Sequence, residues 1–154
     1  MQMMFQMQMI IALIFIPSCY AILGIGKEQS VTAMGTLKCN RKPISGLEVK
    51  LYIKEMKFNR KLAQVITDRK GSFLLRASAR KISKMKPHLV IHHNCNFEGP
   101  CRRKYTRKIS SEYIGNGRSS PIFNLGTLDL DSFLREQTID CLKWRDPSVP
   151  DYSA

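Results

Sequence analysis

All three histidines of the chain fall close to two cysteines, a combination of residues that can bind zinc. His88, His92 and His93 precede Cys95 and Cys101, and imidazole nitrogen and thiolate sulfur are preferred zinc ligands. On an extended strand, however, His92 and His93 point to opposite faces, and His88 and His92 lie roughly 13 Å apart along one face. Two ligands of one ion cannot be so far apart. We therefore predict structural histidines and no bound metal.

The cysteines could instead form disulfides. The chain contains Cys19, Cys39, Cys95, Cys101 and Cys141, and the last four, an even number, predict two disulfides in an oxidising compartment. We expect Cys95–Cys101 to close a loop between two antiparallel strands. Cys39–Cys141 would then join the two ends of the domain and stabilise it by about 4 to 5 kcal/mol, while Cys39–Cys101 and Cys39–Cys95 stay open as alternatives. A redox pair is not indicated, because it needs a Cys-x-x-Cys motif on a helix, and the sequence does not contain this motif.

A nucleophilic site is not visible in the sequence. Serine, histidine and aspartate all occur, but they do not form a Gly-x-Ser-x-Gly elbow or a comparable local motif. We therefore predict a protein that is not an enzyme and that uses no cofactor.

Positive charge is the most distinctive property of the chain. It contains 25 Lys and Arg against 12 Asp and Glu, a formal charge of +13. One predicted strand carries five candidate anion-binding residues, Arg102, Arg103, Lys104, Arg107 and Lys108, and a second cluster consists of Arg76, Arg80, Lys81, Lys84 and Lys86. Such clusters attract acidic phospholipid head groups, sulfated glycans or acidic proteins. The simpler alternative is a solvated face, because consecutive strand residues alternate between faces and form a flat strip only at a sheet edge.

The elements that position these residues are predicted to be short β-strands. Apolar residues recur with a period of two between turn residues, and helix patterns are weak, with candidates only at 77–85 and 131–138. About seven strands are expected, at residues 31–37, 47–53, 63–67, 72–76, 88–93, 102–109 and 122–130. Turns every 8 to 12 residues or so are typical of an all-β, two-sheet antiparallel sandwich.

The ends of the chain differ from this pattern. Residues 1–26 contain no charged side chain, and the apolar run at 9–16 is too short to span a bilayer. Small residues follow it, so we predict a signal peptide at residues 1–21, cleaved between 21 and 26, rather than a buried or membrane-anchoring helix. The domain is expected at 27–141 and a disordered tail at 142–154. The mature protein would be secreted and extracellular, without a transmembrane anchor, and nucleic acid is not an expected partner.

Several motifs, in the same order along the chain, resemble the nematode transthyretin-like family. The strongest is Ile91-His-His-Asn-Cys-Asn96 followed by Pro100-Cys-Arg-Arg-Lys-Tyr-Thr106; the others include Gly35-Thr-Leu-Lys-Cys-Asn40, Gly71-Ser-Phe73, Phe123-Asn-Leu-Gly-Thr-Leu-Asp-Leu130 and Asp140-Cys141. The resemblance covers residues 29–141 and implies a secreted, prealbumin-type sandwich with disulfides. His93 matches a histidine of the family, and we expect its hydrogen bond to hold the loop that leads to Cys95.

The resemblance implies little about chemistry, because most members of the family have no assigned activity. We expect an extracellular binding or adaptor protein for an anionic lipid or glycan surface or for a protein partner. A carrier of a small apolar ligand is the alternative, and it requires a cavity. The related 5-hydroxyisourate hydrolases end in Tyr-Arg-Gly-Ser, whereas this chain ends in Pro150-Asp-Tyr-Ser-Ala154, so that activity is not expected.

Overall fold

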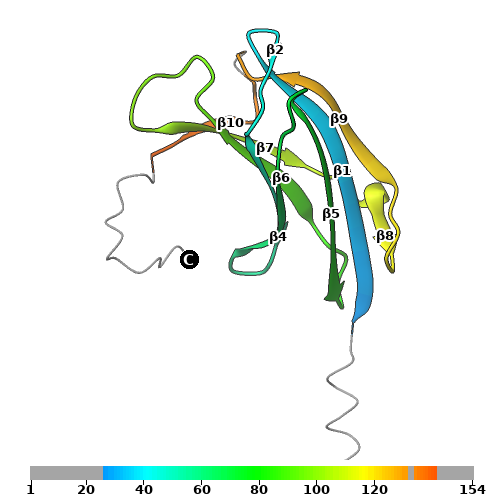
Figure 1. The fold of residues 1–154 in the computed structure, drawn as a ribbon. Coiled ribbons are helices and arrows are strands. Elements are labelled where there is room, and N and C mark those ends of the chain that lie inside the picture. Colours follow the sequence, from blue (N-terminus) through cyan, green and yellow to red (C-terminus); the bar gives the residue numbers. More distant parts are fainter. Residues whose placement is uncertain (1–25, 132–133, 142–154) are drawn as a thin grey trace, which may run out of the picture.

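Two β-sheets lie face to face in the computed structural model, which describes residues 26–131 and 134–141 (Figure 1). The first sheet contains β1 (Lys27–Cys39), β2 (Lys42–Pro43), β5 (Ser72–Lys81), β8 (Ile114–Asn116) and β9 (Ile122–Asp129). The second sheet, in the order β10-β7-β6-β3-β4, contains β3 (Glu48–Lys54), β4 (Asn59–Ile66), β6 (Pro87–His93), β7 (Arg102–Lys108) and β10 (Gln137–Asp140). The predicted all-β, two-sheet sandwich is confirmed. The predicted signal peptide at 1–21 and tail at 142–154 lie outside the described residues.

The period-two pattern of the sequence explains how the sheets pack. In β3, Val49, Leu51 and Ile53 are completely buried, and the residues between them face solvent. Each strand contributes its apolar side to the space between the sheets, and burial of this surface stabilises the fold. Fully buried side chains from both sheets fill that space: Val31, Leu37, Val49, Leu51, Ile53, Leu89, Ile91 and Leu130.

Strand pairing departs from the sequence expectation in one respect. Every pair is antiparallel except β1 and β9, which run parallel, with a register shift between Met34 and Thr36. At the shift, a Cβ on Gly35 would lie 2.9 Å from the Leu125 Cβ, so glycine is required where β1 and β9 approach each other.

Both weak helix predictions are wrong. Residues 77–81 continue β5, because this strand pairs with β1 along its whole length, from Lys27↔Lys81 to Thr36↔Ser72. Residues 137–140 form β10, which pairs with β7. A short 3₁₀ helix, η1 (Ser111–Tyr113), lies between β7 and β8. No helix among the described residues is long and apolar enough to cross a membrane.

The disulfide pairing that we expected first is also wrong. The structure joins Cys39 to Cys95, with Cα atoms 5.8 Å apart, and Cys101 to Cys141, with Cα atoms 4.2 Å apart. Cys39 ends β1 and Cys95 follows β6, so the first bond links the two sheets where these strands end. The second bond joins neighbours in one sheet, because β7 and β10 are antiparallel and place Arg102 opposite Asp140.

A buried glutamine fixes the loop between β5 and β6. Gln29 is 6% exposed; its Nε2 donates to the carbonyl of Ser83 at 2.9 Å, and its Oε1 accepts from the backbone N–H of Met85 at 2.8 Å. Buried amides require such partners. The loop is therefore held against the sandwich at the end where β1 begins.

Candidate anion-binding face

The five cations predicted on β7 divide between the two faces of the second sheet. β7 lies between β6 and β10, not at an edge. Because strand residues alternate, Arg102, Lys104 and Lys108 lie on the outer face, and Arg103 and Arg107 lie on the opposite face. The structure thus brings three of the predicted residues together and separates the other two from them.

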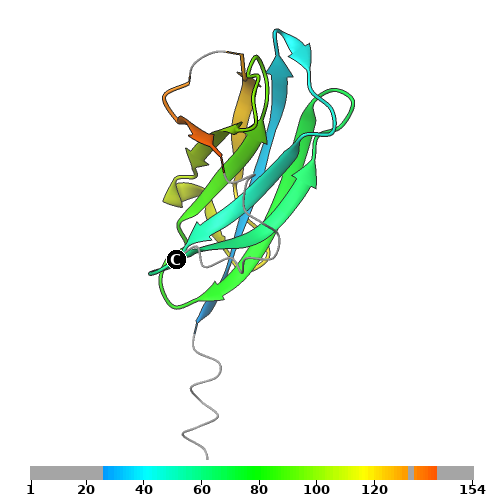
Figure 2. The same ribbon diagram turned by 90° about the vertical axis from the view of Figure 1, so that its left-hand side faces the viewer.

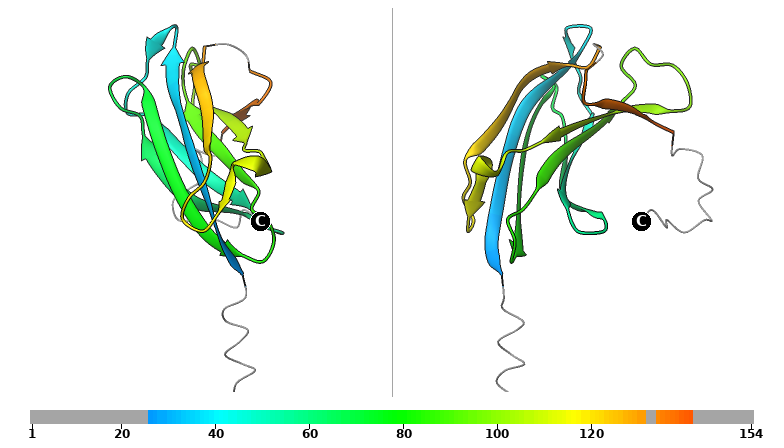
Figure 3. Two further views of the ribbon diagram at one scale, coloured as in Figure 1. Left: turned by 90° about the vertical axis from the view of Figure 1, so that its right-hand side faces the viewer. Right: turned by 180° about the vertical axis from the view of Figure 1, so that it is seen from behind.

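Arg107 and Arg103 both contact side chains of the protein, Arg107 through an ion pair and Arg103 through an aromatic ring. The Arg107 Nη1 lies 2.7 Å from the Glu136 Oε1, and the Arg103 guanidinium lies 5.3 Å from the centroid of the Phe97 ring. β7 and β10 extend away from the first sheet (Figures 1 and 3), which explains why charged side chains occur on the face that elsewhere forms the core.

Two further cations come from β3, and sequence reasoning did not include them in the site. The outer residues of β3 are Glu48, Lys50, Tyr52 and Lys54, and Glu48 pairs with Lys50. β3 pairs with β6, which pairs with β7. The register places His88 between Tyr52 and Lys108, and places Lys104 opposite His92. We define the basic face as the outer-face cations of β3 and β7, namely Lys50, Lys54, Arg102, Lys104 and Lys108.

The pKa of His88 reflects its burial and the cations that surround it on the basic face. Burial lowers the pKa of His88, and the positive charges of Lys104, Lys108 and Lys54 lower it further against an opposing hydrogen bond with the Lys86 backbone. The ring also stacks on Tyr52, with centroids 5.9 Å apart. His88 is therefore neutral near pH 7, and the charge of the face comes from lysine and arginine.

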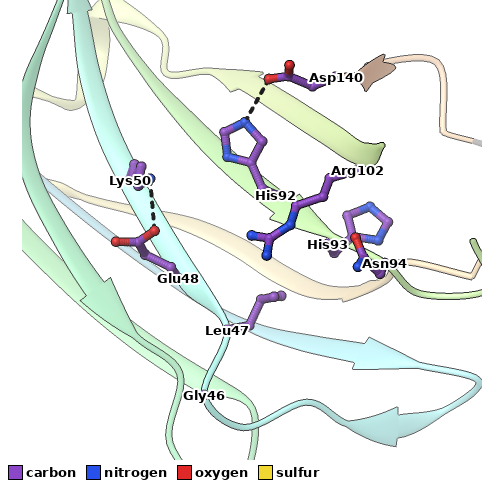
Figure 4. Close-up of a pocket in the computed structure, with 9 residues that line it drawn as sticks. All are labelled: Gly46, Leu47, Glu48, Lys50, His92, His93, Asn94, Arg102 and Asp140. Atoms are coloured by element: carbon purple, nitrogen blue, oxygen red, sulfur yellow. Dashed lines mark hydrogen bonds and ion pairs between the residues drawn. The ribbon is translucent and has the colours of Figure 1, made fainter. Parts of the chain in front are cut away.

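An open groove of about 640 Å³ lies at one end of the basic face (Figure 4). In it, the Lys50 Nζ pairs with the Glu48 Oε2 at 2.8 Å, and the His92 Nε2 lies 3.2 Å from the Asp140 Oδ2. The Arg102 guanidinium points into the space between these two pairs. Within residues 26–131 and 134–141, no ion pair joins Arg102 to an acid.

The two neighbouring histidines have structural contacts and point to opposite faces, as the sequence predicts. Burial lowers the pKa of His92 despite its contact with Asp140. His93 is 3% exposed, and its Nδ1 accepts a hydrogen bond from the backbone N–H of Cys95 at 3.3 Å. The predicted role of His93 in holding the loop to Cys95 is confirmed. The four paired cysteines are not available as metal ligands, and residues 26–131 and 134–141 contain no group of three His, Cys, Asp or Glu placed to hold a metal.

His93 is expected to make the fold sensitive to acid. Burial, with Arg103 and His92 nearby, lowers its pKa to about 4, whereas the unfolded chain takes up the proton near pH 6.5. Between these values the unfolded state binds more protons, so stability is greatest above pH 6.5 and falls as the pH decreases toward 4. We expect about 3 kcal/mol of this loss to come from His93 by pH 4. Urea unfolding across this range tests it, with His93→Gln as the reference. Equal pH dependence of the two proteins would contradict the prediction.

The carrier alternative receives no support from the grooves described here. The space between the sheets is filled by the core side chains. The groove beside the basic face is open to solvent, and two further open grooves lie on the outside of the first sheet, one lined by Thr32 and Arg76 and the other by Met34 and Leu74. An apolar ligand would need an enclosed, mainly apolar cavity.

The sequence comparisons with known proteins all point to the same family. Residues 34–110 match the Transthyretin-like family. Transthyretin-like protein 5 of Caenorhabditis elegans is 35% identical over 141 residues, covering 88% of this chain and 99% of the relative. Transthyretin-like protein 33 of the same organism is 32% identical, and the match covers 82% of this chain and 94% of the relative. Transthyretin-like protein 2 is 31% identical, and the match covers 81% of this chain and 99% of the relative.

Proposed function

Because the chain belongs to the transthyretin-like family, we propose that it is a secreted extracellular binding protein that recognises anionic surfaces through its basic face. The observation that carries this proposal is the convergence of Lys54, Arg102, Lys104 and Lys108, from two strands separated by β6, on one side of a sheet. Lys50 lies on the same side, where its charge is paired with Glu48. Because these side chains lie on one side of the sheet, they can contact one anionic surface at the same time.

The physical basis is the short range of electrostatic attraction in salt solution. The Debye length is about 8 Å at physiological ionic strength, so a protein gains affinity only from cations that face the same surface. Each Lys or Arg close to an anionic membrane contributes about 1 kcal/mol. The outer face of the second sheet therefore supports stronger binding than the same charges dispersed over the molecule.

An extracellular location is part of the proposal. The two disulfides are of the kind that persists in oxidising compartments, and the uncharged apolar segment at the start of the chain is typical of a secretory leader. Phospholipid head groups and sulfated glycans are the anionic surfaces that such a protein meets outside the cell.

The test uses protein secreted into the medium by cells that express the full chain. Its binding is measured to phosphatidylserine-containing vesicles, to neutral phosphatidylcholine vesicles and to heparin, each over a series of NaCl concentrations. We expect binding to an anionic surface that weakens steadily as salt increases, and little binding to neutral vesicles. Retention of the protein inside the cells, or no binding to either anionic surface at low salt, would contradict the proposal.

A further inference from the structure

Three large apolar side chains are exposed at one end of the sandwich. Met56, Phe58 and Ile82 have relative exposures of 101%, 57% and 81%. The first two lie in the β3–β4 loop, and Ile82 lies in the β5–β6 loop. These two loops lie at the end where β1 begins, because Lys27 pairs with Lys81 (Figures 1 and 2). We call residues 55–58 and 82–86 together the tip.

The two loops of the tip are fixed to each other. The backbone N–H of Lys54 donates to the Lys86 carbonyl at 3.1 Å, and the Glu55 N–H donates to the Phe58 carbonyl at 2.9 Å. Lys81 forms an ion pair with Glu55, which also contacts Arg60 at 3.4 Å. Gln29 holds the β5–β6 loop from inside. These hydrogen bonds and the ion pair hold the two loops of the tip in place.

The tip is surrounded by positive charge. Segments 54–61 and 80–86 together contain eight Lys and Arg and one Asp or Glu, so they account for +7 of the formal +13. The hydrogen bond from Lys81 holds the pKa of Glu55, the single acid, below its usual value, so that this carboxylate stays ionised and paired. Lys54 also belongs to the basic face, which makes the two surfaces continuous.

We propose that the tip inserts Met56, Phe58 and Ile82 into the interfacial region of an anionic lipid bilayer while the surrounding lysines and arginines contact the head-group phosphates. The proposal rests on the proposed function and specifies its partner. A bilayer offers an anionic layer above an apolar layer, and the tip offers apolar side chains inside a ring of cations. A sulfated glycan would match the charge, but it has no apolar phase for these side chains.

The test compares the secreted protein with the triple variant Met56→Ser/Phe58→Ser/Ile82→Ser in sedimentation with phosphatidylserine-containing vesicles. Because the affinity of such insertion scales with the buried apolar area, we expect the variant to bind at least about tenfold more weakly. Its affinity for heparin should be unchanged within about twofold. Ile66→Ser/Ile139→Ser is the matched control, since both isoleucines are 63% exposed and lie outside the tip; it should bind vesicles like the original protein.

A second measurement reports insertion itself. In the Phe58→Trp variant, tryptophan emission should shift to the blue on addition of anionic vesicles, relative to the unsubstituted protein. Equal vesicle affinity of the triple variant and the original protein, or no blue shift under conditions where the variant binds vesicles, would overturn the proposal. Binding to heparin without binding to vesicles would overturn insertion and leave the proposed function standing, whereas binding to neither would overturn both.

Discussion

Replacing Cys39 and Cys95 by alanine is expected to lower the free energy of unfolding by about 4 kcal/mol. The bond closes a loop between residues 56 positions apart, and its removal gives the unfolded chain the conformational freedom that the loop closure had taken away. It also removes a direct link between the two sheets. Since domains of this size unfold with about 5 to 15 kcal/mol, the variant should be marginally stable at 37 °C.

Urea unfolding at neutral pH, followed by circular dichroism, measures this loss. The control is Cys101→Ala/Cys141→Ala, whose bond spans 40 residues and joins β7 to β10 within one sheet. Entropy alone predicts a similar loss for both variants, so any excess for the first would measure the link between the sheets. A loss below about 1 kcal/mol for Cys39→Ala/Cys95→Ala would contradict the account. Peptide mapping without reduction tests the pairing itself.

Neutralising three cations of the basic face is expected to weaken binding to anionic vesicles by at least about a hundredfold. The variant Lys54→Gln/Lys104→Gln/Lys108→Gln loses three charges that face the same surface, at about 1 kcal/mol each. The same substitutions should leave the free energy of unfolding nearly unchanged, because Lys54 and Lys108 are exposed, Lys104 is half-buried, and none of the three forms an ion pair with another described residue.

The matched control removes the same charge from the other end of the molecule. Lys42, Arg69 and Lys70 are exposed at the end of the sandwich remote from the tip. Lys42→Gln/Arg69→Gln/Lys70→Gln should weaken binding less than about fivefold, because these charges lie beyond the screening distance of a bound surface. Equal weakening by the two triple variants would mean that net charge, and not the basic face, determines affinity.

Local pattern was sufficient to predict most of the strands. The alternation of Val49, Leu51 and Ile53 with polar residues fixed both the strand and its buried side. It failed at residues 77–81, where Ala77 and Ala79 alternate with polar residues but alanine also favours helix, so that only the pairing with β1 identifies the strand. The parallel pairing of β9 depends on contacts between distant segments, and no local pattern contains that information.

The candidate site was predicted only in part for the same reason. Alternation within 102–108 indicates that Arg103 and Arg107 face away from Lys104 and Lys108, but only the topology shows which strands lie beside β7. Lys50 and Lys54 join the basic face because β6 pairs with both β3 and β7. The disulfide partners follow from the same arrangement. The apolar residues of the tip had a visible signal, since Met56 and Phe58 interrupt a mainly charged segment, residues 54–61, between two predicted strands.

Lysine footprinting shows which lysines contact a bound anionic membrane. The secreted protein is treated with an amine-acetylating reagent with and without phosphatidylserine-containing vesicles, and the modification of each lysine is quantified by mass spectrometry. We predict that bound vesicles protect Lys54, Lys104 and Lys108, whereas Lys42 and Lys70 stay as reactive as in the free protein. Uniform protection of all five lysines, or unchanged reactivity of the first three in a sample shown to be bound, would contradict recognition through the basic face.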